Sequence, residues 1–493
     1  MGDEMNLHYI STRGDKNKVT ASEAIVKGIA PDGGLYVPEA IPQLDIAPEM
    51  LAQMPYAELA YEVLKLYLTD FTEAELRACI EGAYGSGFDD PKIAPVVEVN
   101  GAYFLELFHG RTLAFKDMAL SILPRFMMTA AKKLGIDKEI CILTATSGDT
   151  GKAALSGFAD VEGTKIVVFY PEGGVSEVQR LQMVTQEGDN TRVIGVRGNF
   201  DDAQTGVKQI FMDEAFAKEL DAKGVQLSSA NSINIGRLVP QIVYYFYAYG
   251  QMVASGAIKA GEAMNFVVPT GNFGNILAGH YAREMGLPVK ELLCASNENC
   301  VLHDFFSTAV YDKNRQFILT ASPSMDILVS SNLERLLYQL SGDGAAVNDM
   351  MQALNTAGKY TFDAKGCGIA SGLASEDETF AAIAEMSANG YVMDTHTAVA
   401  YKTWRKRAAE TKDEAKTVVV STASPYKFGA SVCAAITGGD YTESTPDELF
   451  AELEKLSKVS VPTAIAGLAQ KPVLHTQVCG KDDMQAAVRG FLM

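Results

Sequence analysis

Short apolar runs recur along most of the chain, each followed by a loop rich in Gly, Ser and Thr and then by a segment with helical spacing of apolar residues. The segments that contain an apolar run and the loop after it are residues 139–155, 163–174, 191–202, 265–279 and 417–429. Continuous apolar runs are typical of strands buried on both faces, and their alternation with helices predicts a parallel α/β sheet. Ligands of such sheets bind beyond the carboxyl ends of the strands, where loops enter helix N-termini. These polar loops are therefore the first candidates for a functional site.

The first 95 or so residues have a different pattern. Turn signals at residues 30–38 precede helical periodicity at residues 56–68, which predicts a mostly helical N-terminal unit. The longest apolar stretch, residues 242–258, contains four tyrosines and several polar residues, so we expect a buried helix rather than a membrane span. The chain has no tandem repeat or low-complexity tract, and linkers between its units are expected to be short.

Composition narrows the class of protein. A length of 493 residues indicates two or three packed units, and 47% hydrophobic with 21% charged residues is typical of a globular enzyme. The formal net charge of −19 disfavours binding to nucleic acid or to an anionic membrane, so an anionic substrate needs a locally positive pocket. The seven cysteines form no CxxC pair and the acidic start lacks a signal-peptide pattern, which together favour the cytoplasm.

The loop Gly271–Asn275 follows one of the apolar runs and precedes a helix-like segment. Gly271 and Gly274 allow the backbone to approach an anion closely, and the helix N-terminus adds a partial positive charge. The loop therefore fits a phosphate site. An ordinary strand-to-helix turn, in which glycine only permits a positive φ, explains the same residues equally well.

A second polar loop, residues 144–152, also lies between a strand-like run and a helix-like segment. Ser147, Thr150 and the amides of Gly148 and Gly151 could bind a carboxylate. The spacing is not that of a nucleotide-binding P-loop. Simple capping of the helix by Ser147, Asp149 or Thr150 is the alternative.

Lys116 lies between Phe115 and Asp117 in a sparsely charged, aromatic segment. Burial would lower the pKa of this amine and make it a better nucleophile toward an aldehyde. An ordinary solvated lysine is the alternative.

Other catalytic patterns find no support. The six histidines form neither HxxxH nor HExxH, so we assign no metal, and the GxSxG motif of serine hydrolases is absent.

Taken together, the loops resemble those of the threonine synthase family, whose members are fold-type-II pyridoxal-phosphate enzymes. The resemblance covers nearly the whole chain. It rests on YISTRG, GIAPDGGLYVPEAIP, HGRTLAFKD, TATSGDTG, GNFDDAQ, NSINIGRLVPQIVYYF, PTGNFGN, DTHTAVAY and STASPYKF.

The resemblance implies a fold like that of the tryptophan synthase β chain, with two α/β domains that contain parallel-rich sheets. The division that we expect is a helical unit at 1–95, a large cofactor-binding domain at 96–134 and 231–440, a small α/β domain at 135–230, and a C-terminal helical extension at 441–493. It also implies the cofactor pyridoxal 5′-phosphate, the substrate O-phospho-L-homoserine, and a monomer or homodimer.

The resemblance further assigns roles to individual residues. Lys116 is expected to bind the cofactor covalently and then to move protons. The residues expected to hold the cofactor phosphate are Gly271, Asn272, Phe273, Gly274 and Asn275, with Thr422 beside the pyridine nitrogen. The residues expected to bind substrate are Ser147, Gly148, Asp149 and Thr150 at its carboxylate, and Asn231, Ser232 and Arg237 at its phosphate.

Two positions depart from the family pattern. Arg111 stands where the family usually has proline, and Ser424 stands where it often has histidine.

The implied reaction converts O-phospho-L-homoserine and water into L-threonine and phosphate. The alternatives are a related phospholyase or threonine/serine dehydratase, which would release a 2-oxo acid, and a non-catalytic binding protein on the same scaffold.

Overall fold

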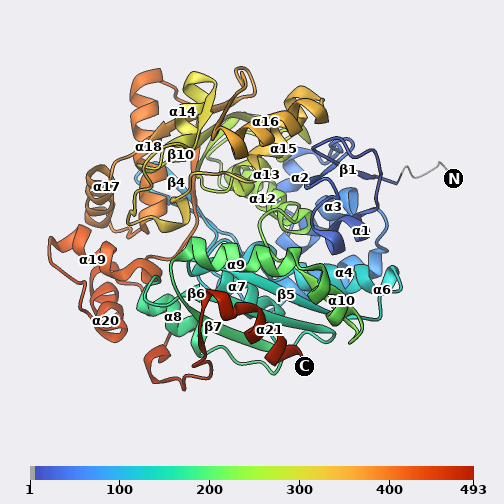
Figure 1. The fold of residues 1–493 in the computed structure, drawn as a ribbon. Helices are drawn as coiled ribbons and strands as arrows, with labels where there is room; N and C mark the ends of the chain where they lie inside the picture. The colour runs from blue at the N-terminus through green and yellow to red at the C-terminus, as the bar shows by residue number, and fades with distance from the viewer. Residues whose placement is uncertain (1–5) are drawn as a thin grey trace.

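The computed structural model describes residues 6–493. The first five residues lie outside it, and the expectation that the chain lacks a signal-peptide pattern rests partly on them. Two parallel-rich sheets organise the described chain (Figure 1). The large sheet has the order β13-β10-β9-β14-β4-β3, and the small sheet the order β15-β7-β6-β5-β8. All neighbouring strands are parallel except β3 and β4, which pair antiparallel. The predicted α/β class with parallel-rich sheets is confirmed.

The bounds of the strands agree with the apolar runs. The large sheet comprises β3 (Val96–Val99), β4 (Ala102–Glu106), β9 (Met264–Pro269), β10 (Val289–Ser296), β13 (Ile369–Leu373) and β14 (Thr417–Ser421). The small sheet comprises β5 (Glu139–Ala145), β6 (Thr164–Pro171), β7 (Thr191–Arg197), β8 (Val225–Ser228) and β15 (Val478–Gly480). Every residue of β9 and β14 is buried, because helices cover both faces of the sheet, and this explains why the two strands are mostly apolar. Two short antiparallel pairs complete the strands: β1 (Tyr9–Ser11) with β2 (Tyr36–Pro38), and β11 (Val310–Asp312) with β12 (Lys359–Thr361).

Helices surround both sheets. Those up to the small sheet are α1 (Ala21–Lys27), α2 (Pro48–Leu51), α3 (Tyr56–Tyr67), α4 (Glu73–Tyr84), α5 (Asp117–Leu120) and α6 (Leu123–Lys133). Those that follow strands of the small sheet are α7 (Asp149–Phe158), α8 (Glu177–Val184), α9 (Phe200–Met212) and α10 (Glu214–Asp221). Those that belong to the large-sheet half are α11 (Ile235–Leu238), α12 (Pro240–Ala254), α13 (Gly274–Glu284), α14 (Val301–Thr308), α15 (Leu333–Ser341), α16 (Gly344–Thr356), α17 (Glu376–Ala388) and α18 (Thr395–Thr411). The C-terminal part contains α19 (Gly429–Thr437), α20 (Pro446–Ser457) and α21 (Met484–Leu492).

The tyrosine-rich apolar stretch forms α12, which packs against α2 and α3 of the N-terminal part and against α13. Tyr244, Tyr245 and Tyr249 are fully buried in it. Within the described residues, no helix is long and apolar enough to cross a membrane.

The end of the chain returns to the small sheet. β15 pairs in parallel with β7, and α21 packs on α9 (Figure 1). The range 441–493, for which we predicted helices, thus also supplies a strand. The domain boundaries themselves stay predictions.

Candidate active site

The carboxyl ends of three adjacent strands position the main candidate residues. In the parallel order β9-β14-β4, the chain leaves β9 toward Gly271, leaves β14 toward Thr422, and leaves β4 toward Lys116. Phe115 donates its backbone N–H to the Thr422 carbonyl at 2.8 Å, which keeps the Lys116 segment beside the end of β14. Parallel pairing therefore gathers residues that are 306 positions apart in the sequence.

Lys116 lies between the two sheets. Its side chain is 12% exposed, and its Nζ lies 3.6 Å from Asp149 Oδ2, on the helix that follows β5 of the small sheet. Nζ also donates to the Ser324 hydroxyl at 3.4 Å. Burial lowers the pKa of Lys116; the Asp149 charge opposes this shift, and the positive charges of Lys427 and Arg237 add to it. A neutral amine, the form that acts as nucleophile and base, is thus easier to reach than in water.

Asp149 belongs to a buried ion pair. Its Oδ1 lies 2.9 Å from Nζ of Lys427, a lysine whose side chain is wholly buried, and it also accepts a hydrogen bond from Gln179 Nε2 at 3.0 Å. Burial alone would raise the pKa of Asp149, but Lys427 and Lys116 outweigh it and hold that pKa well below its usual range. Asp149 is therefore an anion whose side chain points at two lysines.

The loop before Asp149 requires glycine at position 148. Gly148 has a φ of 129°, and a Cβ there would lie 2.4 Å from Gln179 Cδ. Thr146 Oγ1 accepts the N–H groups of Gly148 and Gly151 at 3.0 and 2.9 Å. Ser147 is exposed and Thr150 is half-buried at the N-terminus of α7, where the first backbone N–H groups have no intrahelical acceptor. These hydroxyl and N–H groups are the donors that the loop offers to a carboxylate.

The glycine turn after β9 has the features of an anion cradle. Phe273 adopts the left-handed conformation at a φ of 64° and α13 begins directly after it, so the helix N-terminus follows the turn. Asn275 Oδ1 accepts the hydroxyl hydrogens of Tyr244 and Tyr245 at 2.8 and 2.7 Å. Its Nδ2, although buried, has no hydrogen-bond partner among the described residues. A buried unsatisfied donor is costly, and a phosphate oxygen would satisfy it.

Ser324 connects this cradle with Lys116. A Cβ at Gly271 would lie 2.5 Å from the Ser324 carbonyl oxygen, and the Ser324 hydroxyl accepts from Lys116 at 3.4 Å. The two features that the sequence analysis proposed as the ends of one cofactor therefore contact the same residue. Asn332 Nδ2 donates to two carbonyls, that of Asn272 at 3.0 Å and that of Ser232 at 3.2 Å. Asn272, which is exposed at the tip of the turn, is thereby linked to Ser232.

Arg237 is a buried cation that has no carboxylate partner among residues 6–493. It is 5% exposed, its Nη1 donates to the Ala230 carbonyl at 2.8 Å, and its Nε has no partner within the described part of the chain. Burial lowers the pKa of Arg237 to about 10. Because an unpaired buried charge is costly, Arg237 is suited to binding an anionic ligand. Asn231 and Ser232 lie half-buried on the turn just before its helix α11.

The two departures from the family pattern lie in different surroundings. Arg111 is exposed, and it lines a small cavity of about 30 Å³ together with Asp117 and Arg125. Ser424 is buried, and its backbone N–H donates to the Leu113 carbonyl at 3.0 Å. Thr422, two residues earlier, is also buried.

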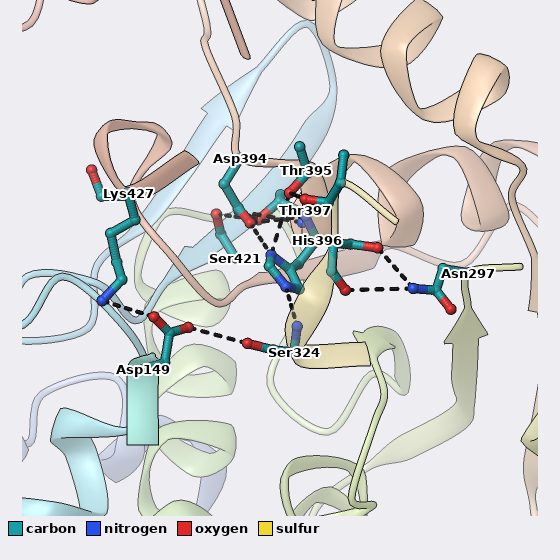
Figure 2. Close-up of polar contacts among 12 residues, drawn as sticks. Asp149, Asn297, Ser324, Asp394, Thr395, His396, Thr397, Ser421 and Lys427 are labelled. Atoms are coloured by element: carbon teal, nitrogen blue, oxygen red, sulfur yellow. Dashed lines mark hydrogen bonds and ion pairs between the residues drawn. The ribbon is translucent and has the colours of Figure 1, made fainter. Parts of the chain in front are cut away.

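Three further side chains of the site had no role predicted from the sequence. Figure 2 shows Lys427 and Ser324 on either side of Asp149, and His396 joined to Ser324 by a hydrogen bond. Lys427 lies within STASPYKF and His396 within DTHTAVAY, but these motifs do not indicate what either side chain does. Ser324 lies in a long loop with no motif, and nothing local in the sequence could have found it.

Comparison with known proteins agrees with this geometry. The family profile "Threonine synthase N terminus" matches residues 8–84, "Pyridoxal-phosphate dependent enzyme" matches 91–423, and "Threonine synthase, C-terminal" matches 397–486. A threonine synthase of Pseudomonas aeruginosa is 40% identical over 438 residues, which cover 86% of this chain and 90% of that protein.

Two solved structures have the same fold over nearly their whole length. The pyridoxal-phosphate-bound threonine synthase of Brucella melitensis has a TM-score of 0.85 at 36% identity, covering 98% of this chain and 99% of that chain. The yeast threonine synthase has a TM-score of 0.88 at 31% identity, covering 99% of both chains. The chain therefore belongs to the threonine synthase family of pyridoxal-phosphate-dependent enzymes.

Proposed function

We propose that this protein is a threonine synthase that converts O-phospho-L-homoserine and water into L-threonine and inorganic phosphate. The observation that carries the proposal is that Lys116, after β4, and the Gly271 turn, after β9, both lie against Ser324. One small ligand with an aldehyde and an anionic group can contact both. Threonine synthase relatives that align over most of the chain support the choice of reaction.

The residues present fit pyridoxal 5′-phosphate. The free Nδ2 of Asn275, the close approach that only glycine allows at position 271, and the N-terminus of α13 suit its phosphate. Lys116 would hold its aldehyde, and the buried Thr422 hydroxyl would lie beside its ring. When bound, this cofactor attaches the amino group of the substrate and stabilises negative charge that develops at the substrate carbons.

The protein supplies binding and proton transfer. We assign the substrate carboxylate to the hydroxyl and N–H groups of Ser147, Gly148 and Thr150, with Asp149 holding the loop through Lys427. We assign the substrate phosphate to Arg237, helped by Asn231 and Ser232. The lowered pKa of Lys116 suits its amine to take the proton from Cα, and a second proton must leave Cβ before phosphate departs from Cγ. Cγ then takes up a proton, water adds its hydroxyl at Cβ, and the amine returns a proton to Cα.

One set of assays tests the proposal. Purified protein loaded with pyridoxal 5′-phosphate is given O-phospho-L-homoserine, and phosphate, threonine and 2-oxo acid are measured together; threonine and serine are tested as substrates in separate reactions. We expect equal amounts of phosphate and threonine. Phosphate with a 2-oxo acid would make the protein a phospholyase, and turnover of threonine or serine to a 2-oxo acid would make it a dehydratase. No product from O-phospho-L-homoserine, threonine or serine would support the non-catalytic binding protein.

The surroundings of the enzyme are also proposals. Seven free cysteines, six of them buried, support a reducing compartment, and we propose the cytoplasm. The charge of −19 supports the expectation of no nucleic-acid partner. We propose a monomer or homodimer, which light scattering on purified protein would distinguish.

A further inference from the structure

Ser324 bridges the two ionised groups at the centre of the site. It lies in the one-turn 3-10 helix Pro323–Met325, within the long loop between β11 and α15. Its hydroxyl donates to Asp149 Oδ2 at 3.1 Å and accepts from Lys116 Nζ at 3.4 Å. Because Asp149 is an anion and can only accept, the hydroxyl hydrogen is committed to it, and Ser324 must present a lone pair to Lys116. The direction of both hydrogen bonds is therefore determined.

A buried histidine holds the backbone of Ser324. His396 Nε2 accepts the Ser324 N–H at 3.1 Å, and His396 Nδ1 lies 2.8 Å from Asp394 Oδ1 (Figure 2). The side chains of His396 and Asp394 are 3% and 0% exposed. Since Nε2 accepts, the imidazole hydrogen must be on Nδ1, where it is donated to Asp394. The Asp394–His396 pair thus fixes one acceptor at one place.

The loop around Ser324 has other attachments. Asn297 Nδ2 donates to Ser322 Oγ at 3.0 Å and to Asp326 Oδ1 at 2.8 Å, and Thr395 Oγ1 donates to the Ala321 carbonyl at 2.7 Å. These contacts hold the residues on both sides of Ser324. A change at His396 should therefore release the position of Ser324 without unfolding the loop.

We propose that Ser324 is a further catalytic residue, which orients the Lys116 amine by accepting its hydrogen bond, and that the Asp394–His396 pair is the device that positions Ser324. The inference rests on the proposed function only in taking Lys116 as the reactive amine. Its two parts are separable, because Ser324 touches the amine and His396 acts through Ser324.

The first experiment measures the reactivity of Lys116 in cofactor-free protein. In Ser324→Ala, Lys116 can close from 3.6 Å onto Asp149 to form a direct ion pair, which favours the unreactive ammonium. We expect labelling of Lys116 by acetic anhydride at pH 8, followed by mass spectrometry, to slow about fivefold, the effect of one ordinary hydrogen bond. With cofactor and O-phospho-L-homoserine, kcat should fall about tenfold with little change in KM. Ser341→Ala, at the exposed end of α15, is the matched control and should label and turn over as the wild type does.

The second experiment separates positioning from packing. His396→Gln places an acceptor oxygen where Nε2 was, while His396→Asn can replace only the Nδ1 contact with Asp394. We expect Gln to retain most of the wild-type labelling rate and kcat, and Asn to match Ser324→Ala. Combining His396→Asn with Ser324→Ala should cause no further loss.

The outcomes are decisive in both directions. Unchanged Lys116 labelling in folded Ser324→Ala would overturn the catalytic role of Ser324, and equal losses in His396→Gln and His396→Asn would overturn the positioning role. Failure of the proposed function looks different, because wild-type protein would then make no threonine while the labelling differences among the variants remained.

Discussion

The buried pair of Lys427 and Asp149 allows a quantitative prediction about stability. We consider Lys427→Met, which keeps most of the side-chain volume and removes the charge. In the wild type, Lys427 Nζ lies 2.9 Å from Asp149 Oδ1 and also donates to the Thr112 carbonyl at 2.8 Å. The substitution leaves a buried carboxylate and a carbonyl without this donor, and Lys116, 3.6 Å away, only partly compensates.

The expected loss follows from the cost of breaking a buried ion pair on one side, about 3–5 kcal/mol. At about 2.1 cal/mol/K of unfolding entropy per residue, a chain of 493 residues that unfolds as one unit has an entropy near 1 kcal/mol/K. The melting temperature should then fall by about 4 °C. Unfolding of one sheet before the other would give a larger shift, because fewer residues contribute entropy.

The pH dependence has a definite sign. A carboxyl group whose folded-state pKa is held low, such as Asp149, contributes stability that is present above its unfolded pKa of about 4 and lost as pH falls through the folded value. Without Lys427, burial raises the pKa of Asp149. The destabilisation of Lys427→Met should therefore be largest near pH 8 and shrink toward pH 5, as Asp149 takes up a proton.

Calorimetry and urea unfolding at pH 5 and pH 8 measure the effect. Lys455→Met, which removes one partner of an exposed pair with Glu452, is the control and should change stability by less than about 0.5 kcal/mol. The double variant Asp149→Asn with Lys427→Met should recover much of the loss, because the uncompensated charge is gone. A double variant as unstable as the sum of the two single variants would refute the reasoning.

Further predictions concern the other groups of the site. Lys116→Ala should fold but lack the visible absorbance of bound cofactor and make no threonine; normal turnover would contradict its role. Arg237→Leu should lower kcat/KM for O-phospho-L-homoserine about 100-fold while a phosphate-free amino acid binds as before, as measured by steady-state kinetics and titration. Gly148→Ala should reduce kcat by at least about tenfold, because its Cβ would meet Gln179 and its φ is strained; near-normal kinetics would mean that the loop adjusts freely. His109 has a pKa raised to about 9 despite burial, by Asp89 and Glu106, so its stabilisation is complete below about pH 6.5 and lost as pH rises through 9. In urea unfolding, His109→Gln should cost about 1 kcal/mol at pH 6 and little at pH 10.

Much of the site could be predicted because its strands and the loops after them have recognisable local sequence patterns. The runs before Ser147, Gly271 and Thr422 are mostly apolar, since β5, β9 and β14 lie between layers of helices. Gly148 has a φ of 129°, a backbone conformation that glycine adopts without strain. Such demands are local, and they remain visible in a single sequence.

The partners of Lys116 could not be found in this way. Asp149 and Ser324 contact it and Lys427 contacts Asp149, and these residues come from three different parts of the fold, 33 to 311 positions away along the chain. Hydrogen bonds and ion pairs depend on distances of a few ångströms, which the spacing of residues along a chain does not determine. The role of Ser324 is the clearest case, because its loop has no periodicity and no motif.

The amino-acid sequence predicts the parallel α/β class, the polar loops at the strand ends and the lysine among aromatic residues, because burial and backbone conformation constrain each position separately. Three features are visible only in the folded chain: Asp149 faces two lysines, Arg237 is buried with no counter-ion among the described residues, and Ser324 contacts both Lys116 and the Gly271 turn. Electrostatic and hydrogen-bond energies arise between groups that folding brings together, whatever their separation along the chain.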